Sequence, residues 1–348
     1  MQISFFAETN RLQRLSNMGD PLEKVAKHID FEIFRPLLLK SLELDKKIRT
    51  NGGRPPFDCI LMWKMVLLQQ WYGISNDSIE FQINDRLSFQ RFLGLGLNEK
   101  VPDANTLWDF KEALANKNID RQLFDMFESM MEEQGVITRT GSLVDASFVD
   151  VPRQRNSRDE NKTIKEGNVP DEWQENTPKA KHKLSQKDTD ARWTKKNNET
   201  HYGYKDHVKV DKDSKMIVDF SVTDASVHDS KELAGLIDED DDIVYADSAY
   251  VGEDLENEIK GDHPEIDLRF IKRAYRNNPL TDEVKLENKE HSKVRVRVEH
   301  VFGYMTMSMG GMFIRTVGDV RANAEIARKN LAYNLRRFVW HDSRPKPA

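Results

Sequence analysis

Apolar residues recur at intervals of three and four along the first 135 residues of the chain, which is the spacing of one face of an α-helix. Clusters of glycine, proline and asparagine separate these runs, and Gly135 follows the last of them. Helices are therefore predicted over about residues 22–50, 57–71, 75–83, 88–93, 106–115 and 119–134. The pattern indicates an all-helical N-terminal domain over residues 1–135.

The periodicity changes at Val136, where short runs rich in β-branched and apolar residues begin to alternate with helical patterns. Strands are predicted over residues 142–149, 204–210, 216–223, 243–246 and 268–271, and helices over 230–236, 253–260, 282–305 and 320–340. Such alternation is typical of an α/β arrangement around a mixed sheet. We expect a second domain over residues 136–340, so the chain combines helical and α/β parts in a mixed α+β class.

A polar segment at about residues 152–200 interrupts this alternation. Its basic side chains include Arg153, Arg155, Arg158, Lys179, Lys181, Lys183, Lys187, Arg192, Lys195 and Lys196. Long segments of this composition are uncommon inside a domain, and they bury too little apolar surface to fold alone. We therefore expect a long, flexible basic insertion that becomes ordered on a partner.

Composition narrows the class of protein. The single cysteine, Cys59, excludes an intrachain disulfide and a cysteine-based zinc cluster, and it is typical of a reducing compartment. The first residues lack the basic and apolar regions of a signal peptide, and the most apolar run, residues 59–68, is too short to cross a bilayer. The expected location is the cytoplasm, with no membrane as partner.

The charge balance gives no direct guide to partners. The chain has 53 Lys and Arg against 59 Asp and Glu, a net charge of −6, and its pI is near 5.9. This balance argues against a uniformly basic surface for nucleic acid, but it does not show how charge is distributed. The acidic run 238–242 supplies much of the negative charge and is predicted to be a solvated loop.

Two aspartates stand in or directly after apolar strands. Asp145 interrupts the predicted strand 142–149, and Asp247 follows the predicted strand 243–246. A carboxylate buried there is costly unless it is paired or bound to a cation, and ligands collect at the carboxyl ends of strands in α/β sheets. Taken singly, each aspartate is also explained as the cap of a neighbouring turn or helix.

A third carboxylate favours a cation site over two separate caps. Glu299 lies in a valine-rich segment, residues 292–301, and Arg295 precedes it by one helical turn. β-branched residues are unfavourable in an exposed helix, so we expect this helix to pack on a sheet, although an exposed ion pair is the simpler alternative. Three carboxylates from two strands and a helix suit Mg²⁺ or Mn²⁺, and two such ions can clamp a phosphodiester.

Seven segments in consistent order resemble the DDE-type insertion-sequence transposases, in particular the group named after insertion sequence five. They are 52–56 with the helix ending in 69–73, then 101–110, 141–146, 201–211, 224–230, 245–252 and 295–303. The resemblance spans about residues 50–340. It implies a helical N-terminal DNA-binding domain followed by a ribonuclease-H-like α/β domain with a mixed central sheet.

The resemblance also implies an activity and its cofactors. Asp145, Asp247 and Glu299 are similar to the family's catalytic triad, which binds two Mg²⁺ ions that Mn²⁺ can replace. The implied reaction is cleavage of the element's ends and joining of the 3′-OH to target DNA. The implied partners are double-stranded DNA, namely the terminal inverted repeats and the target, and further copies of the chain in a homodimer or larger synaptic complex. The implied location is therefore associated with the nucleoid.

Six further residues are candidates for DNA contacts: Lys293, Arg295, Arg297, His300, Lys205 and Trp193. Trp193 lies among cations, a composition that suits stacking on an unpaired base, although a polar loop explains it equally well. The family signature Tyr-x-x-Arg-x-x-x-Glu-x(6)-Lys keeps Arg295 and Glu299, but Ser292 and Thr306 stand at its first and last positions.

Two alternative functions remain open at this point. A metal-dependent nuclease of the same fold would share the triad, whereas a non-catalytic DNA-binding protein, such as a domesticated transposase or a repressor, would not need it. The helices around residues 102–115 are compatible with a helix-turn-helix that recognises element ends and equally with a plain packing element.

Overall fold

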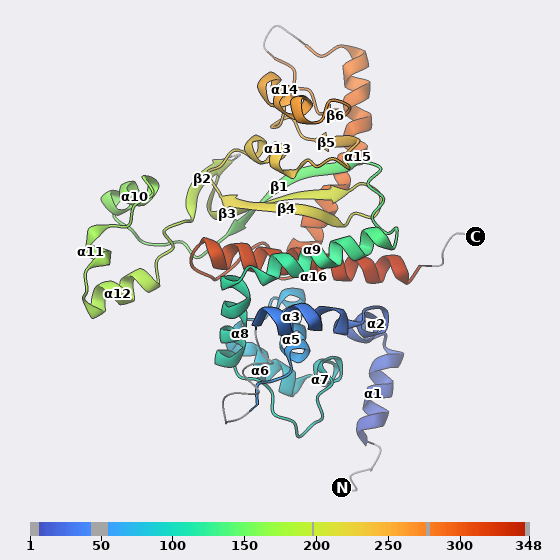
Figure 1. The fold of residues 1–348 in the computed structure, drawn as a ribbon, viewed down its shortest axis with the longest axis vertical. Helices are drawn as coiled ribbons and strands as arrows, with labels where there is room; N and C mark the ends of the chain where they lie inside the picture. The colour runs from blue at the N-terminus through green and yellow to red at the C-terminus, as the bar shows by residue number, and fades with distance from the viewer. Residues whose placement is uncertain (1–6, 43–54, 197, 276–278, 345–348) are drawn as a thin grey trace. The chain divides into compact units, whose positions relative to one another are not determined.

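The computed structural model describes residues 7–42, 55–196, 198–275 and 279–344 (Figure 1). Contacts divide the chain into two compact units. The first unit holds residues 1–126, 308–310 and 327–348, and the second holds 127–307 and 311–326. The last predicted helix was assigned to the second domain, whereas most of it groups with the first unit by contacts. The domain limits 1–135 and 136–340 themselves stay predictions.

Helices make up the first unit within the described residues. They are α1 (Ala7–Asn17), α2 (Pro21–His28), the 3₁₀ helix η1 (Phe31–Phe34), α3 (Arg35–Leu42), α5 (Cys59–Tyr72), α6 (Asn76–Asp85), α7 (Leu87–Leu93), α8 (Ala104–Asn116) and the start of α9 (Ile119–Glu133). The end of α16 (Asp319–Asp342) completes the set. The sequence pattern missed α1, and the predicted helix beyond residue 42 and the motif at 52–54 lie outside the described residues.

Helix α5 is the central element of this unit because almost its whole surface is buried. The Asp58 side chain caps its start by accepting hydrogen bonds from the Ile60 and Leu61 amides, and Gly73 ends it in the left-handed conformation. Trp63 in its middle is fully buried. The α16 helix is fastened to α5 by the indole of Trp71, which donates to the Ala332 carbonyl at 2.9 Å.

A buried ion pair also fixes α16 within the first unit. Arg328 Nε donates to Asp120 Oδ1 at 2.8 Å, its terminal nitrogen donates to Asp120 Oδ2 at 2.9 Å, and both side chains are almost fully buried. A bidentate pair of this kind has strict geometry, and removing one partner leaves a buried charge without compensation.

A mixed sheet forms the centre of the second unit. Its strands are β1 (Ser142–Asp150), β2 (Arg192–Lys196), β3 (Glu199–Asp211), β4 (Ile217–Asp224), β5 (Ile243–Ala246) and β6 (Asp267–Phe270). The main order is β2-β3-β1-β5-β6, and β4 also pairs with β3. Strand β3 is antiparallel to β2, β1 and β4, whereas β1, β5 and β6 pair in parallel. The predicted class, a helical N-terminal region followed by an α/β part with a mixed central sheet, is confirmed.

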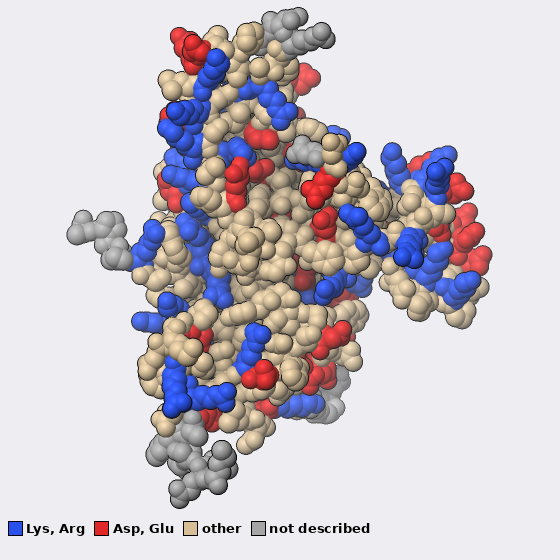
Figure 2. All heavy atoms as spheres, turned by 180° about the vertical axis from the view of Figure 1, so that it is seen from behind, with Lys and Arg blue, Asp and Glu red and all other residues tan. Residues whose placement is uncertain are grey.

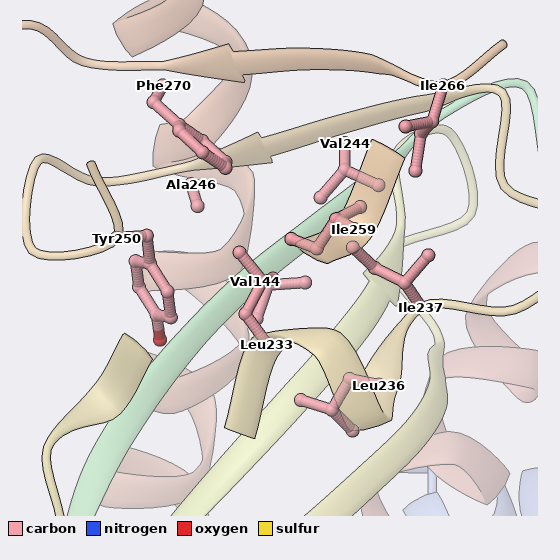
Figure 3. Close-up of a cluster of buried hydrophobic side chains, with 10 residues drawn as sticks. All are labelled: Val144, Leu233, Leu236, Ile237, Val244, Ala246, Tyr250, Ile259, Ile266 and Phe270. Atoms are coloured by element: carbon pink, nitrogen blue, oxygen red, sulfur yellow. The ribbon is translucent and has the colours of Figure 1, made fainter. Parts of the chain in front are cut away.

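The two faces of this sheet have different roles. Val144, Val244 and Ala246 point toward the side covered by α13 (Leu233–Leu236) and α14 (Glu253–Asp262), where they form an apolar cluster (Figure 3). Because side chains alternate along a strand, Asp145 and Tyr245 point to the opposite side. Helix α15 (Asp282–Ser308) lies on that side, since the Tyr245 ring meets His291 edge-on at 5.8 Å.

The segment 152–200 was expected to be flexible, and this expectation is wrong. It forms α10 (Arg158–Lys165), α11 (Asp171–Gln174) and α12 (Pro178–Ser185) before β2 begins. Ser157 and Glu160 form a capping box at the start of α10. Trp173 is buried between the helices, where its indole donates to Glu160 at 2.9 Å.

The insertion is also less basic than its cations suggest. Residues 152–200 contain 12 Lys and Arg but also nine Asp and Glu, so their net charge is only +3 (12 − 9). In Figure 2 the part of the molecule that projects at the right, formed by this segment, carries both basic and acidic side chains. Its composition therefore does not create a uniform attraction for DNA.

The insertion leaves and rejoins the sheet at neighbouring positions. Asp150 at the end of β1 pairs with Gly203 of β3, and Arg192 at the start of β2 pairs with the same glycine. A Cβ atom at Gly203 would lie 2.2 Å from the Val149 carbonyl oxygen, so this junction requires glycine.

The acidic run 238–242 was predicted to be a solvated loop, and this prediction is wrong for part of it. Lys209 lies fully buried in β3, and its ammonium group donates to Asp238 at 2.6 Å and to Asp241 at 2.8 Å. Asp241 is itself buried and also accepts a hydrogen bond from Ser142. The loop therefore neutralises a lysine in the centre of the sheet.

No helix among the described residues is both long enough and apolar enough to cross a membrane.

We predict that Asp120→Asn lowers the free energy of unfolding of the first unit by about 3–5 kcal/mol, because the buried Arg328 then loses its bidentate ion pair with Asp120. Urea denaturation measures the change. Arg121→Gln is the matched control: Arg121 forms an exposed pair with Asp125, so its loss should cost less than about 1 kcal/mol. Equal effects from the two variants would contradict the role assigned to the buried pair.

Candidate active site

The pairing of β1 with β5 places two aspartates at the same level of the sheet. Ser142 pairs with Val244 and Leu143 with Tyr245, an offset of 102 residues in both cases (244 − 142 and 245 − 143). Asp145 and Asp247 differ by the same 102 residues, and neighbouring strands lie about 4.8 Å apart. The two carboxylates are therefore neighbours, as the sequence pattern predicts for strands of one sheet.

The environment of Asp145 makes its charge costly. Burial raises the pKa of Asp145 to about 6, and the negative charge of Asp247 adds to the increase. Three groups lower the pKa: the Ala146 amide donates to one carboxylate oxygen at 2.8 Å, Arg295 donates to the other at 3.0 Å, and the positive charge of Lys196 adds to their effect. A partly buried carboxylate beside a second one is an arrangement that a bound cation would stabilise.

Asp247 lies in a tight turn directly after β5. One of its oxygens accepts a hydrogen bond from the Ala249 amide at 2.6 Å. This bond is an Asx turn, so the simpler explanation of Asp247 as the cap of a local turn holds for that oxygen. The turn also fixes the direction of the carboxylate close to Asp145.

Arg295 joins the strand to the helix. From α15 its guanidinium donates to Asp145 at 3.0 Å with one terminal nitrogen and to Glu299 with the other. The pair of Arg295 and Glu299 is therefore more than an exposed contact within one helix, because it includes a residue 150 positions earlier. Asp145 and Glu299 therefore share one positively charged partner, the Arg295 guanidinium.

Tyr250 is a residue of this site to which the sequence pattern assigned no role. Its hydroxyl is buried and has no hydrogen-bond partner among the described residues. Burial raises the pKa of Tyr250, and the charges of Asp145, Asp229 and Asp247 raise it further. The signal was its position three residues after Asp247 in a segment that resembles the family. The hydroxyl can donate to a water or a phosphate oxygen near the carboxylates.

Three of the candidate DNA contacts share helix α15 with Glu299 but have other partners. Lys293 pairs with Glu290 at 2.7 Å on the surface, and His300 Nδ1 lies 2.9 Å from the Lys215 ammonium. Arg297 donates to the Lys212 carbonyl at 2.6 Å and lies 3.2 Å from Asp213. The hairpin between β3 and β4 therefore holds Arg297.

Lys205 and Trp193 lie apart from the carboxylates. Lys205 is buried on the α13 side of the sheet, where its ammonium group donates to Asp229 at 2.7 Å. Trp193 in β2 is 43% exposed, and its ring lies 4.6 Å from that of Tyr202 and 5.8 Å from the Arg153 guanidinium. An exposed tryptophan beside a cation is available for stacking.

The donor set fits a hard divalent cation. Among the described residues, no three His, Cys, Asp or Glu side chains are close enough to hold a metal as they stand. The oxygens of Asp145, Asp247 and Glu299 are nevertheless the ligands that Mg²⁺ and Mn²⁺ prefer. One guanidinium group pairs with two of the three carboxylates, and the raised pKa of Asp145 reflects the remaining cost of its charge.

Comparison with known proteins gives two family matches. The family described as "Transposase domain (DUF772)" matches residues 10–113, and the "Transposase DDE domain" family matches residues 137–335. A solved structure titled as a piggyBac transposase synaptic complex with hairpin DNA is similar at 11% identity and a TM-score of 0.45. That likeness covers 94% of this chain and 76% of the other, and it is too weak to support an argument.

The DDE match covers 199 residues (335 − 137 + 1), which is more than half of the 348-residue chain, and it contains all three candidate carboxylates. The second match lies in the helical part that precedes it. The chain therefore belongs to the DDE transposases, and it is a DNA transposase, a metal-dependent enzyme of DNA cleavage and strand transfer.

Proposed function

We propose that this transposase cleaves the ends of an insertion-sequence element and joins the 3′-OH to target DNA at one site formed by Asp145, Asp247 and Glu299. The observation that supports this most directly is the common offset of 102 residues, which puts Asp145 and Asp247 at one level of neighbouring strands. Arg295 connects Glu299 to the same place. Two Mg²⁺ ions, replaceable by Mn²⁺, are the proposed cofactors.

The chain's own residues prepare this site for a phosphodiester. The three carboxylates would hold the ions, which supply positive charge at the reacting phosphate and favour deprotonation of the attacking water or 3′-OH. Because Asp145 is largely buried, little water surrounds it, and charge interactions there are stronger than on the surface. Tyr250 would donate its unpartnered hydroxyl to a phosphate oxygen or to a water between the carboxylates.

Arg295 has two successive partners in this proposal. It holds Asp145 and Glu299 together while their charges are otherwise uncompensated. When cations occupy the carboxylates, its planar group is free to contact a DNA phosphate, a partner that guanidinium binds well. The same side chain would therefore serve first the carboxylates and then the substrate.

The proposed DNA contacts outside the triad fall into two groups. Lys293, His300 and Trp193 are exposed enough to meet DNA without rearrangement of the sheet. Arg297 and Lys205 would have to leave their present partners first. The proposed partners are the terminal inverted repeats, bound with the help of the helical part over residues 1–135, the target DNA, and further copies of the chain in a dimer or larger synapse.

We predict that Asp145→Asn, Asp247→Asn and Glu299→Gln each reduce end cleavage in Mg²⁺ by at least about a thousandfold, because each removes a carboxylate that would hold an ion. Affinity for the same DNA should stay within about threefold. Gel analysis of labelled inverted-repeat DNA measures cleavage. Glu290→Gln, an exposed carboxylate on the same helix, is the control and should cleave normally.

Retention of cleavage by all three variants would show that the triad is dispensable, which is the outcome for a non-catalytic DNA-binding protein. Strand joining with pre-cleaved ends separates a transposase from a nuclease of the same fold. A nuclease would cut these ends but would not join them to a target.

We predict that Mn²⁺ affinity falls about tenfold per pH unit below pH 6 and levels off above pH 7. The pKa of Asp145 is raised to about 6, so the proton competes with the cation only below that value. Titration calorimetry at several pH values measures the affinity. A break near pH 4 would contradict the raised pKa, and Asp145→Asn should lose the break near pH 6.

We predict that affinity for duplex DNA falls steeply with salt despite the net charge of −6, since phosphate contacts release counterions. Lys293→Gln should reduce the slope of log K against log salt by about 1, because one phosphate contact is lost. Fluorescence anisotropy over a salt series measures both slopes. A flat dependence in the unmodified chain would count against DNA contacts by these cations.

A further inference from the structure

A cavity lies at the end of β1, within the second unit and apart from the carboxylates. Its volume is about 280 Å³. Three chain segments line it: the residues that follow β1, the residues that follow α12, and a stretch between α15 and α16. The side chains that matter here are Arg153, Gln154, Lys187, Asp188, Arg315 and Thr316.

The wall of this cavity is positively charged. Arg153, Lys187 and Arg315 all line it, and in the described part of the chain none of them forms an ion pair with an acidic residue. Arg153 donates to the Thr200 carbonyl at 3.0 Å, and Lys187 donates to the Arg155 carbonyl at 2.9 Å. These neutral partners leave three positive charges in the wall uncompensated, which favours an anionic ligand.

The one acidic residue of the wall, Asp188, has hydrogen-bond partners other than the cavity's cations. Asp188 is buried, and its carboxylate accepts hydrogen bonds from the Tyr204 hydroxyl at 2.9 and 3.0 Å. It also accepts from the amides of Ala191 at 2.9 Å and Gly318 at 3.1 Å. These bonds connect the end of α12, β3 and the segment before α16, so Asp188 holds the wall in place rather than neutralising it.

Two polar atoms of the wall have no partner. Thr316 Oγ1 and the buried oxygen of the Gln154 amide are both shielded from solvent and make no hydrogen bond. A buried polar group without a partner costs about 1–3 kcal/mol, so such groups are rare and call for an explanation. The Thr316 hydroxyl can donate to an anionic ligand in the cavity, whereas the Gln154 oxygen is an acceptor and needs a donor such as a water.

An exposed aromatic residue stands beside the same cations. The Arg153 guanidinium lies 5.8 Å from the Trp193 ring, which is 43% exposed. An aromatic face of this kind stacks on an unpaired base, whereas the bases of a duplex already stack on one another. The volume lies near the lower end of small-ligand sites, roughly 300–1,000 Å³, and is too small for a duplex.

We propose that this cavity binds the phosphate of an unpaired DNA strand, held by Arg153, Lys187 and Arg315 and by the hydroxyl of Thr316, with the adjacent base stacked on Trp193. Six residue steps along β1 and just past its end lead from Asp145 to Val151 at the cavity's edge, a path of about 20 Å. One DNA strand from the carboxylates would therefore reach the cavity after about six base steps of B-form spacing, or fewer when stretched. This proposal of a single-strand subsite depends on the proposed function only because both take DNA as the ligand.

The test compares affinity for an oligothymidine with affinity for a duplex of the same length, by fluorescence anisotropy in EDTA at one salt concentration. Arg153→Gln combined with Arg315→Gln, and separately Trp193→Ala, should weaken oligothymidine binding by about tenfold and duplex binding by less than about threefold. Lys179→Gln combined with Lys181→Gln removes the same charge from the exposed surface of α12. That control should change both affinities equally and slightly.

Thr316→Val tests the cavity without changing its charge. Removal of an unpartnered buried hydroxyl should leave thermal stability unchanged or raise it, while oligothymidine binding falls about fivefold. An unchanged oligothymidine affinity in this variant would overturn the proposal. Equal losses for single strand and duplex in the arginine variant, like those of the lysine control, would also overturn it, because they would reflect general charge attraction.

The experiment is independent of the catalytic proposal because it contains no metal and no cleavage step. Normal single-strand binding by the cavity variants, together with loss of cleavage in Asp145→Asn, would support the catalytic triad and contradict the single-strand subsite. Weakened single-strand binding by the cavity variants, together with normal cleavage by Asp145→Asn, would support the subsite and contradict the triad.

Discussion

The parallel pairing of β1 with β5 is the constraint on which the second unit depends. Its register sets Asp145 and Asp247 side by side, and a shift of one residue would turn one of the two carboxylates to the other face of the sheet. The register is held by the apolar cluster on the far side, where Val144 and Val244 are buried beneath α13 and α14. Core packing on one face therefore determines the chemistry on the other.

The same sheet carries buried charge on both faces and compensates it in different ways. On the α13 side, Lys209 has two aspartates from the following loop as fixed partners. On the α15 side, Arg295 is shared between two carboxylates while Asp247 adds a further negative charge. The first arrangement is complete and structural, whereas the second has more negative than positive charge and suits a site for cations.

Much of the fold could be predicted because local pattern determines it. Strand β1 was predicted over 142–149 and runs to Asp150, and β5 was predicted with its observed bounds. Asp145 and Asp247 could be singled out because a carboxylate in or directly after an apolar strand is a local signal, and the triad with Glu299 stays a prediction. The contact between Arg295 and Asp145 could not, because it joins residues 150 positions apart.

The two predictions that failed, for the acidic run 238–242 and for the insertion, also depend on contacts between residues far apart in the sequence. The acidic run 238–242 looks solvated in the sequence, and only the fold supplies Lys209 as its partner from a strand about 30 residues earlier. The insertion looks flexible because its helices are short and polar, yet three buried residues, Ile164, Trp173 and Ala180, form a small core between them, with a capping box at the start of α10. Low average hydropathy conceals such a small core.

The insertion between β1 and β2 has a consequence for how this chain can vary. Asp150 and Arg192 pair with the same residue, Gly203, on its two sides, so the segment starts and finishes at almost one point of the sheet. Closing a loop between such points costs little more when the loop grows, because the entropy of closure rises only with the logarithm of length. Related chains can therefore lengthen, shorten or exchange α10–α12 in evolution while the strand that bears Asp145 keeps its place.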